Sequence, residues 1–342
     1  MNIVFATDNN YVVHLTASLA SLISNNKNND LNIIILHGGL TEVHQNNIMI
    51  LKKLQINQKI DISFIDCTHL IHSYNQRGYI SKAAMYRLYL PILLPNINKV
   101  LYIDPDTIIK EDLSSLYNED ISNYYVAGCR DLILVHLLRS IGKISFQGKR
   151  LSWEEYYQHL GLSYANMYHY VQSGVLVFNL EKIRYDNKAN LMINLFAKYP
   201  SLVFHDQDIL NIAFQGEMKL LDIRYNFYDP RNQLLHGNLG ASEYSEYELA
   251  KYNPAIIHFT GGDKPWNFKK NYFLCYYKEY FKYLQLTAYK LPYTKLKLLL
   301  MLNNLRLCRR ILFQIKETKK FVRFTILGVT ITINWSKIFK WY

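Results

Sequence analysis

Apolar residues in the first 270 positions form short continuous runs, and these runs alternate with longer segments of helical spacing. Runs bounded by Gly, Asn and Asp are typical of buried strands. The expected strands are Asn2–Ala6, Leu31–Leu36, Ile60–Ile65, Val100–Ile103, Gly174–Leu180 and Ala255–His258. Apolar residues spaced three and four apart predict helices over His14–Ser24, Thr41–Leu54, Ala83–Leu90 and Asp208–Phe214.

This alternation predicts an α/β fold with a mostly parallel sheet and helices on both faces. Ligands of such sheets bind at the carboxyl ends of the strands. The polar residues that follow each strand are therefore the first candidates for a functional site. Neither a GxGxxG pattern nor a P-loop follows any of the expected strands, which disfavours an ordinary dinucleotide site or a P-loop kinase.

The clearest chemical signal is the segment KVLYIDPDTII at Lys99–Ile109. A buried strand delivers two carboxylates, Asp104 and Asp106, into a loop with one residue between them. Like charges held this close repel each other and favour a cation between them. A divalent ion with oxygen ligands meets that need and can also bind a diphosphate. Without further context, an acidic turn after a strand is the more common explanation of such a pair.

Four other segments match motifs of one known protein family, in the same order along the chain. They are NIVFATDNNY at Asn2–Tyr11, SKAAMYRLYL at Ser81–Leu90, HDQDIL at His205–Leu210 and HFTGGDKPW at His258–Trp266. Over about residues 1–270 the chain thus resembles the family 8 retaining glycosyltransferases, which include bacterial lipopolysaccharide hexosyltransferases and glycogenin. The resemblance implies a GT-A, Rossmann-like catalytic domain in residues 1–270 and a C-terminal extension in residues 271–342.

The resemblance also implies roles for individual residues. Asp104, Asp106 and His258 would ligate Mn²⁺ or Mg²⁺, and a mixed N and O ligand set suits manganese. The nucleotide of a UDP-glucose or UDP-galactose donor would be held by Ala6, Asp8, Asn10 and Tyr11, and its diphosphate by Gly261 and Lys264. The sugar would be contacted by Arg87, Asp131, Asp206, Gln172, Ser173 and Gly174.

For the reaction, the resemblance places Gln207 on the β face of the donor sugar. The amide oxygen of Gln207 would stabilise an oxocarbenium-like transition state during a same-face displacement. In the alternative, a double displacement, Asp206 would be the nucleophile. The segment Gln172-Ser173-Gly174 departs from the Asn-Ala-Gly or Asn-Ser-Gly turn usual in the family. Because glutamine is one methylene longer, its contact with the sugar is expected to shift, which affects donor preference.

Composition separates the chain into a neutral body and a basic tail. The chain has 342 residues and a net charge of +12, but from Lys282 onward there are 13 basic residues and one acid, Glu317. The remainder is therefore neutral. Leu296–Ile315 is expected to form a basic amphipathic helix and Phe324–Asn334 a strand or hairpin. With Trp335, Phe339 and Trp341, this tail predicts attachment to an anionic membrane surface; a packed subdomain or an oligomer interface is the alternative.

Other features limit the cellular setting. The four cysteines are scattered and form no CxxC pair, which disfavours a disulfide framework or a zinc site. The first residues lack the features of a signal peptide, and no apolar stretch is long enough for a spanning helix. We therefore expect a cytoplasmic protein at the inner face of the membrane. A recognised nucleic-acid-binding module is absent, so nucleic acid is not an expected partner.

The predicted function is the transfer of glucose or galactose from a UDP-sugar to a carbohydrate acceptor, expected to be a lipopolysaccharide or lipooligosaccharide core. Three alternatives remain. The 29 tyrosines allow self-glucosylation of the glycogenin type. A non-catalytic, membrane-associated protein that binds nucleotide sugar is a second. A nucleotidyltransferase is a third, although the Gly-rich phosphate loop typical of that class is missing. Gly142–Gly148 and Trp153–Tyr170 are the expected acceptor loops.

Overall fold

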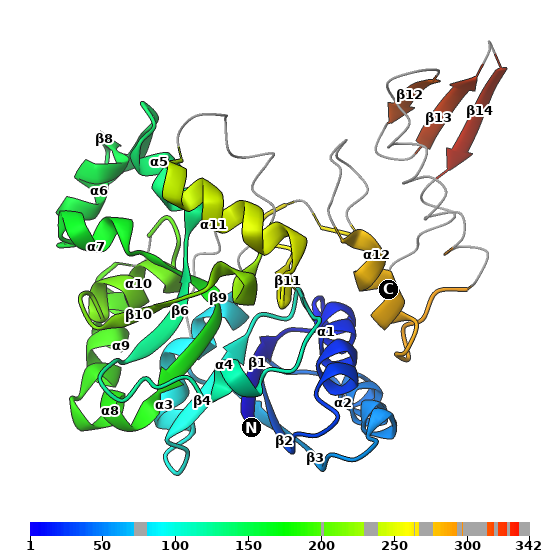
Figure 1. The fold of residues 1–342 in the computed structure, drawn as a ribbon, viewed down its shortest axis with the longest axis horizontal. Helices are drawn as coiled ribbons and strands as arrows, with labels where there is room; N and C mark the ends of the chain where they lie inside the picture. The colour runs from blue at the N-terminus through cyan, green and yellow to red at the C-terminus, as the bar shows by residue number, and fades with distance from the viewer. Residues whose placement is uncertain are drawn as a thin grey trace.

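The computed structural model describes residues 1–71, 81–199, 202–228, 239–262, 264–266, 276–292, 296, 313–317, 321–326 and 329–334. Within this part of the chain a seven-stranded sheet forms the centre of the fold (Figure 1). In spatial order its strands are β10 (Met218–Leu221), β6 (Val126–Arg130), β9 (Val171–Asn179), β4 (Lys99–Ile103), β1 (Asn2–Thr7), β2 (Leu31–His37) and β3 (Ile60–Asp66). Neighbouring strands are parallel except at β9, which runs antiparallel to β4 and β6.

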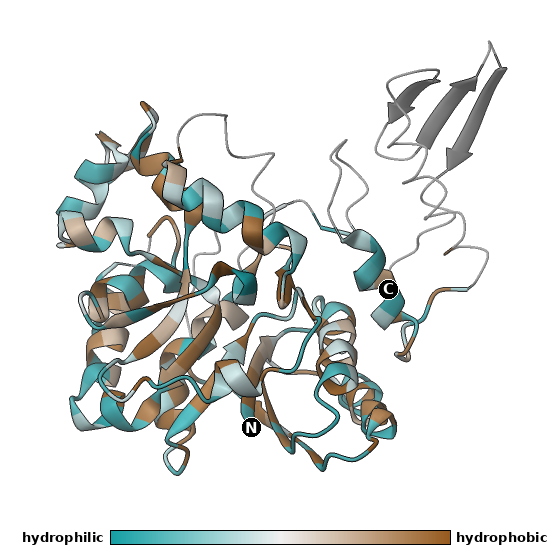
Figure 2. Ribbon diagram, in the orientation of Figure 1, coloured by the Kyte–Doolittle hydropathy of each residue, from teal (hydrophilic) through white to brown (hydrophobic). Residues whose placement is uncertain are grey.

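Side chains of the central strands alternate between two apolar cores, one on each face of the sheet. Ile3 and Phe5 pack with α1 (Val12–Asn25), whereas Val4 and Ala6 face the opposite core. Burial on both faces explains why these strands appear in the sequence as continuous apolar runs. Figure 2 shows the same distribution, with hydrophobic strands inside and hydrophilic outer helix faces. The predicted α/β fold with a mostly parallel sheet is confirmed.

Helices cover both faces. The core beside α1 also receives side chains from α2 (Glu42–Met49), η1 (Ile50–Leu54), α4 (Ser114–Tyr117) and α12 (Tyr277–Leu284). The opposite core is covered by η2 (Lys82–Tyr89), α3 (Leu90–Leu93), α5 (Leu132–Leu138), α6 (Trp153–His159), α7 (Tyr164–Tyr168), α8 (Leu180–Tyr185), α9 (Lys188–Lys198) and α10 (Asp206–Ala213). A smaller cluster joins η3 (Ile223–Asn226) to α11 (Ala241–Tyr252).

In two of the predicted helices, the structure has 3₁₀ rather than α-helical geometry over part or most of the segment. The segment predicted as one helix over Thr41–Leu54 is an α-helix, α2, followed by the 3₁₀ segment η1. The segment predicted over Ala83–Leu90 is mainly the 3₁₀ helix η2. An eight-residue window does not separate periods of 3.0 and 3.6, which is why the pattern alone predicted an ordinary helix.

Beyond residue 270, α12 packs against α1 (Figure 1), and its Tyr280, Phe281 and Leu284 are buried. The predicted hairpin over Phe324–Asn334 is confirmed as β13 (Phe321–Ile326) and β14 (Val329–Asn334), which pair antiparallel, with β12 (Phe313–Glu317) as a third strand. The predicted helix over Leu296–Ile315 is wrong at its end, because 313–315 belong to β12; residues 297–312, Trp335, Phe339 and Trp341 lie outside the described residues. None of the helices in the described part could cross a bilayer.

Candidate active site

The topology brings four strand ends to one edge of the sheet. Because β1, β4 and β6 share a direction, their carboxyl ends meet there, and the antiparallel β9 contributes its amino end. Asp104 follows β4 and donates its backbone N–H to the carbonyl of Gly174 at 2.7 Å. Asp131 follows β6 and donates its own N–H to Tyr170 O at 2.9 Å. Residues that are far apart in the sequence therefore line a single cleft.

A two-stranded ribbon brings His258 to the acidic pair. Strand β5 (Thr107–Ile109) follows the Asp104–Asp106 loop and pairs antiparallel with β11 (Ile256–His258), with His258 opposite Thr107. In addition, Phe259 N–H donates to Asp106 O at 2.9 Å. This pairing places the histidine beside the carboxylates even though about 150 residues separate them in the sequence.

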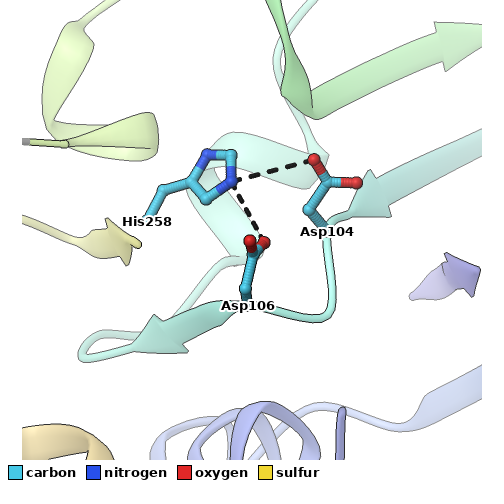
Figure 3. A group of neighbouring side chains, drawn as sticks. All are labelled: Asp104, Asp106 and His258. Atoms are coloured by element: carbon cyan, nitrogen blue, oxygen red, sulfur yellow. Dashed lines mark ion pairs between the residues drawn. The ribbon is translucent and has the colours of Figure 1, made fainter. Parts of the chain in front are cut away.

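The side chains of Asp104, Asp106 and His258 point toward one another (Figure 3). Their ligand atoms all lie within 4.8 Å of one another. His258 Nε2 is 3.1 Å from Asp106 Oδ1 and 3.8 Å from Asp104 Oδ2. Two carboxylates and an imidazole in a cleft form a donor set that fits a divalent cation such as manganese. The opposite ring nitrogen, Nδ1, lies 2.8 Å from Asn226 Oδ1.

Asp106 is strongly stabilised as a carboxylate. Burial alone would raise its pKa, but Lys264 and His258 outweigh that effect and hold the pKa of Asp106 well below its usual range. Lys264 Nζ contacts Asp106 Oδ2 and also donates to the carbonyl of Phe259. The lysine is buried and lines the cleft. A fixed cation beside a candidate metal site is suited to binding the phosphates of a diphosphate.

Asp104 is held by Arg87 from η2. Arg87 Nη2 lies 2.7 Å from Asp104 Oδ1, and the guanidinium stacks 4.3 Å from the ring centre of Tyr102. Tyr102 donates its hydroxyl to the same Asp104 oxygen at 3.0 Å. Burial raises the pKa of Asp104, while Arg87 opposes the rise. The remaining oxygen of Asp104, Oδ2, is the one that faces His258.

Arg87 joins this part of the cleft to Asp206 at the start of α10. Arg87 Nε is 3.1 Å from Asp206 Oδ2 and 2.9 Å from Ala84 O, and Nη1 donates to Ser173 O. Each guanidinium nitrogen is therefore engaged by protein. Burial raises the pKa of Asp206 and Arg87 opposes it. The geometry makes Arg87 an orienting group for two carboxylates.

Gln207, which follows Asp206 in α10, is fixed by hydrogen bonds to its neighbours. Its Nε2 donates to Asp131 Oδ2 at 2.8 Å, and its Oε1 accepts the Ser173 N–H at 3.0 Å. Burial raises the pKa of Asp131. The hydrogen bonds that Asp131 accepts from Leu134, Gln207 and other groups oppose the rise. Since a carbonyl oxygen has two lone pairs, Gln207 Oε1 keeps one for a ligand in the cleft.

The residues expected at the nucleotide lie around the start of α1. Ala6 and Tyr11 line the cleft, as does Gly261, which was expected at the diphosphate. Asp8 and Asn10 do not: Asp8 Oδ1 accepts the N–H groups of Asn10 and Tyr11 at 2.9 and 3.0 Å and so closes the turn into the helix, and Asn10 is exposed. For Asp8, the structure thus shows a role in the turn.

Gln172 and Gly174, at the start of β9, make internal contacts. Gln172 Oε1 accepts the Gly174 N–H at 2.6 Å and the side-chain N–H of Asn226. Gln172 lines the cleft but Gly174 does not, because Gly174 packs under His258. Gln172 is one methylene longer than the asparagine usual in the family, and its amide oxygen contacts Asn226.

Several cleft residues were missed by the sequence analysis. They include Thr7, Ser81, Tyr102, Ile133, Phe204, Tyr228 and Thr260. Tyr228 donates its hydroxyl to Asp131 Oδ1 at 3.0 Å. One signal was available for Tyr102: it stands two residues before Asp104 in a strand, so both side chains point the same way. No motif marked Tyr228.

A buried carboxylate next to Gln207 anchors the start of α10. Asp208 is fully buried and accepts hydroxyl hydrogen bonds from Tyr156, Tyr157 and Tyr170 at 2.9, 3.1 and 2.5 Å. It also accepts the Phe204 N–H at 2.9 Å. Burial raises the pKa of Asp208, and these hydrogen bonds oppose the rise. The network fixes the helix turn that carries Asp206 and Gln207.

We predict that Asp208→Leu destabilises the fold by about 3 kcal/mol, because it leaves buried hydroxyl groups without an acceptor. The shift in the urea unfolding midpoint measures this effect. Asp61→Asn is the control, because Asp61 is a surface carboxylate paired with Lys59 at 3.1 Å; it should change stability by less than about 0.5 kcal/mol. Equal midpoints for wild type and Asp208→Leu would show that the tyrosine network does not stabilise the fold.

Known proteins resemble this chain in sequence and in fold. The model of the family "Glycosyl transferase family 8" matches residues 2–270. A putative glycosyltransferase of Haemophilus influenzae is 30% identical over 279 residues, which cover 81% of this chain and 76% of that protein. The lipopolysaccharide 1,2-glucosyltransferase of Escherichia coli is 27% identical over 280 residues, 79% of this chain and 74% of that protein.

Among solved structures, the galactosyltransferase LgtC in complex with donor and acceptor sugar analogues has a similar fold. Its TM-score is 0.69 at 22% identity, and the match covers 87% of this chain and 99% of that one. This likeness concerns the fold, and it confirms the GT-A-like architecture expected from the sequence.

Proposed function

We propose, because this chain belongs to glycosyl transferase family 8, that its cleft transfers glucose or galactose from a UDP-sugar to a carbohydrate acceptor with retention of anomeric configuration and with Mn²⁺. The observation that carries the proposal is the arrangement of charge along the cleft. Asp104, Asp106, His258 and Lys264 form one cluster. Gln207 and Asp131, which are hydrogen-bonded to each other, line the same cleft.

Under this proposal Asp104, Asp106 and His258 hold the metal ion. The ion, when bound, supplies Lewis-acid stabilisation of the departing diphosphate. Lys264 contributes a second, fixed positive charge to the phosphates. Gly261, which has φ 70, provides a backbone shape in which the chain approaches the diphosphate closely. Ala6 and Tyr11 line the nucleotide end, with Tyr11 contacting the base.

The sugar occupies the region between Arg87, Asp131, Asp206 and Gln207. The spare lone pair of Gln207 Oε1 stabilises positive charge that develops at the anomeric carbon. The carboxylates accept sugar hydroxyl protons in charge-assisted hydrogen bonds. Asp206 is already paired with Arg87 at 3.1 Å, which lowers its availability as a nucleophile and favours the same-face displacement.

The proposed acceptor is a lipopolysaccharide or lipooligosaccharide core. Support comes from the Escherichia coli relative, whose name describes a lipopolysaccharide glucosyltransferase. The hairpin of β7 (Lys143–Phe146) and β8 (Lys149–Ser152) and the helices α6 and α7 follow α5 in the chain. Ile133 of α5 lines the cleft, and α6 contacts α5. The hairpin, α6 and α7 are the proposed acceptor loops.

We further propose that residues 271–342 attach the enzyme to the inner face of the membrane through the basic residues that begin at Lys282. Sedimentation of the protein with phosphatidylglycerol vesicles is the test. Binding that is lost in 0.5 M NaCl is expected; equal binding to neutral phosphatidylcholine vesicles, or none to either, would contradict it.

The proposed reaction is tested by the stereochemistry of its product. The purified chain is incubated with UDP-glucose or UDP-galactose, Mn²⁺ and lipooligosaccharide in detergent, and the new linkage is analysed by proton NMR. An α-glycoside is expected. A β-glycoside would refute retention, and a rise in the mass of the protein itself would identify self-glucosylation instead.

A further inference from the structure

We infer that Asn226 holds His258 in the one neutral tautomer that binds a metal ion, and that Gln172 fixes the orientation of Asn226. The inference rests on the proposed metal-dependent function and adds two positioning residues to its metal site. Neither residue is a ligand: both act through His258, from η3 and from the start of β9.

The direction of the hydrogen bonds is set by a backbone group. Gly174 N–H donates to Gln172 at 2.6 Å. A backbone N–H is only a donor, so the amide oxygen of Gln172 must face it. That same oxygen lies against the side-chain amide of Asn226. Asn226 must therefore turn its NH₂ group toward Gln172 and its oxygen away from it.

The oxygen of Asn226 then faces His258. It lies 2.8 Å from His258 Nδ1 and can only accept a hydrogen bond, so Nδ1 carries the proton. A neutral imidazole with a proton on Nδ1 has its lone pair on Nε2. Nε2 is the atom that lies 3.1 Å from Asp106 Oδ1 and 3.8 Å from Asp104 Oδ2. The Nε2 lone pair and the two carboxylates can all bind one cation. Without a cation between them, the lone pair and the carboxylates repel each other.

Burial protects the hydrogen bond between Asn226 and His258 from water. Asn226 is 1% exposed and His258 4% exposed, which leaves little access for a water molecule to replace the amide. The backbone also holds the pair together, because Phe227 N–H donates to Ile256 O at 2.9 Å and His258 N–H donates to Phe227 O at 2.7 Å. Metal-binding histidines generally depend on such a partner at the second ring nitrogen, and its loss costs about 10- to 100-fold in affinity.

Substitutions at position 226 test the inference. Asn226→Leu has a similar shape but removes the acceptor, so the proton can move to Nε2, where it competes with the metal. Mn²⁺ affinity, measured by electron paramagnetic resonance with UDP present and no sugar donor, should fall about 10- to 100-fold. Asn226→Asp keeps an acceptor for Nδ1–H but loses the N–H that faces Gln172. Its Mn²⁺ affinity should therefore fall less than that of Asn226→Leu.

The control is Asn25→Leu. Asn25 is a partly buried amide at the end of α1 that donates to Ile109 O at 3.0 Å and to Tyr283 Oη at 2.8 Å, outside the residues that line the cleft. The Asn25→Leu variant should be less stable than the wild type but should bind Mn²⁺ with the same affinity. The tautomer itself is read by ¹⁵N NMR of histidine-labelled protein loaded with diamagnetic Mg²⁺, where the signal lost in His258→Asn identifies His258.

Protonated Nδ1 and unprotonated Nε2 are expected in the wild type. Protonated Nε2 there, wild-type Mn²⁺ affinity in folded Asn226→Leu, or equal losses in Asn226→Leu and Asn226→Asp would each overturn the inference. Because no sugar is transferred in these measurements, their outcome is separate from that of the proposed function. A wild type that binds Mn²⁺ as expected but transfers no hexose would refute only the function.

Discussion

Asp106→Asn is expected to lower the rate of metal-dependent UDP release at least about 10³-fold, which corresponds to about 4 kcal/mol of transition-state stabilisation. Asparagine keeps the shape of the side chain but removes the charge that Lys264 and His258 both face. The carboxylate is held ionised by these neighbours, as its lowered pKa indicates. Its loss should therefore weaken the metal site directly. Release of UDP from the preferred donor measures the effect.

Asp112→Asn is the matched control for this variant. Asp112 is also an acid close to β5, but it is exposed and its oxygen accepts the Ser114 N–H at 2.8 Å, a contact that asparagine preserves. Its activity should equal that of the wild type. If Asp106→Asn kept more than about a tenth of the wild-type rate, a loss of under about 1.4 kcal/mol, the acidic pair could not be the metal site.

Gly174→Ala is expected to disable the same site without a change in charge. A Cβ at position 174 would lie 2.2 Å from His258 Cε1 and 2.6 Å from its Nδ1. His258 is buried and its backbone is paired with β5, so the ring must leave its place. We expect Mn²⁺ affinity and activity to fall at least about 100-fold, comparable with the loss of a partner of a metal ligand. Titration with Mn²⁺ measures the first effect and UDP release the second.

A glycine outside the cleft separates this effect from general instability. Gly161 has φ +83 and no atom within 4 Å of a Cβ, so Gly161→Ala should cost about 1 kcal/mol from backbone strain and leave activity intact. Unchanged metal affinity in Gly174→Ala would show that His258 is not required at its present position.

Much of the fold was predictable because burial on both faces of a parallel sheet leaves continuous apolar runs. Asn2–Ala6 and Leu31–Leu36 appear in the structure as β1 and β2 with almost the same bounds. The motif at Asp104 and Asp106 was predictable for a related reason, since strand ends are where such sheets bind ligands. The hairpin β7–β8 carried no comparable signal, because its strands are largely exposed.

The remaining features depend on tertiary contacts between distant segments. The pairing of β5 with β11 brings His258 to Asp106, and no local pattern encodes it; the family resemblance alone suggested that contact. Asn226 ends a short 3₁₀ turn and belongs to no motif, yet its amide faces the histidine ring. The same holds for Tyr228, whose hydroxyl reaches Asp131 across 97 positions.

The most direct test of metal-dependent hexose transfer is UDP release by the wild-type chain from a panel of UDP-sugars, with lipooligosaccharide in detergent as acceptor. The predicted result is release from UDP-glucose or UDP-galactose that requires Mn²⁺, stops on addition of EDTA and resumes when Mn²⁺ is restored. Release that is equally fast in EDTA, or no release from any donor in the presence of Mn²⁺ and acceptor, would contradict the account.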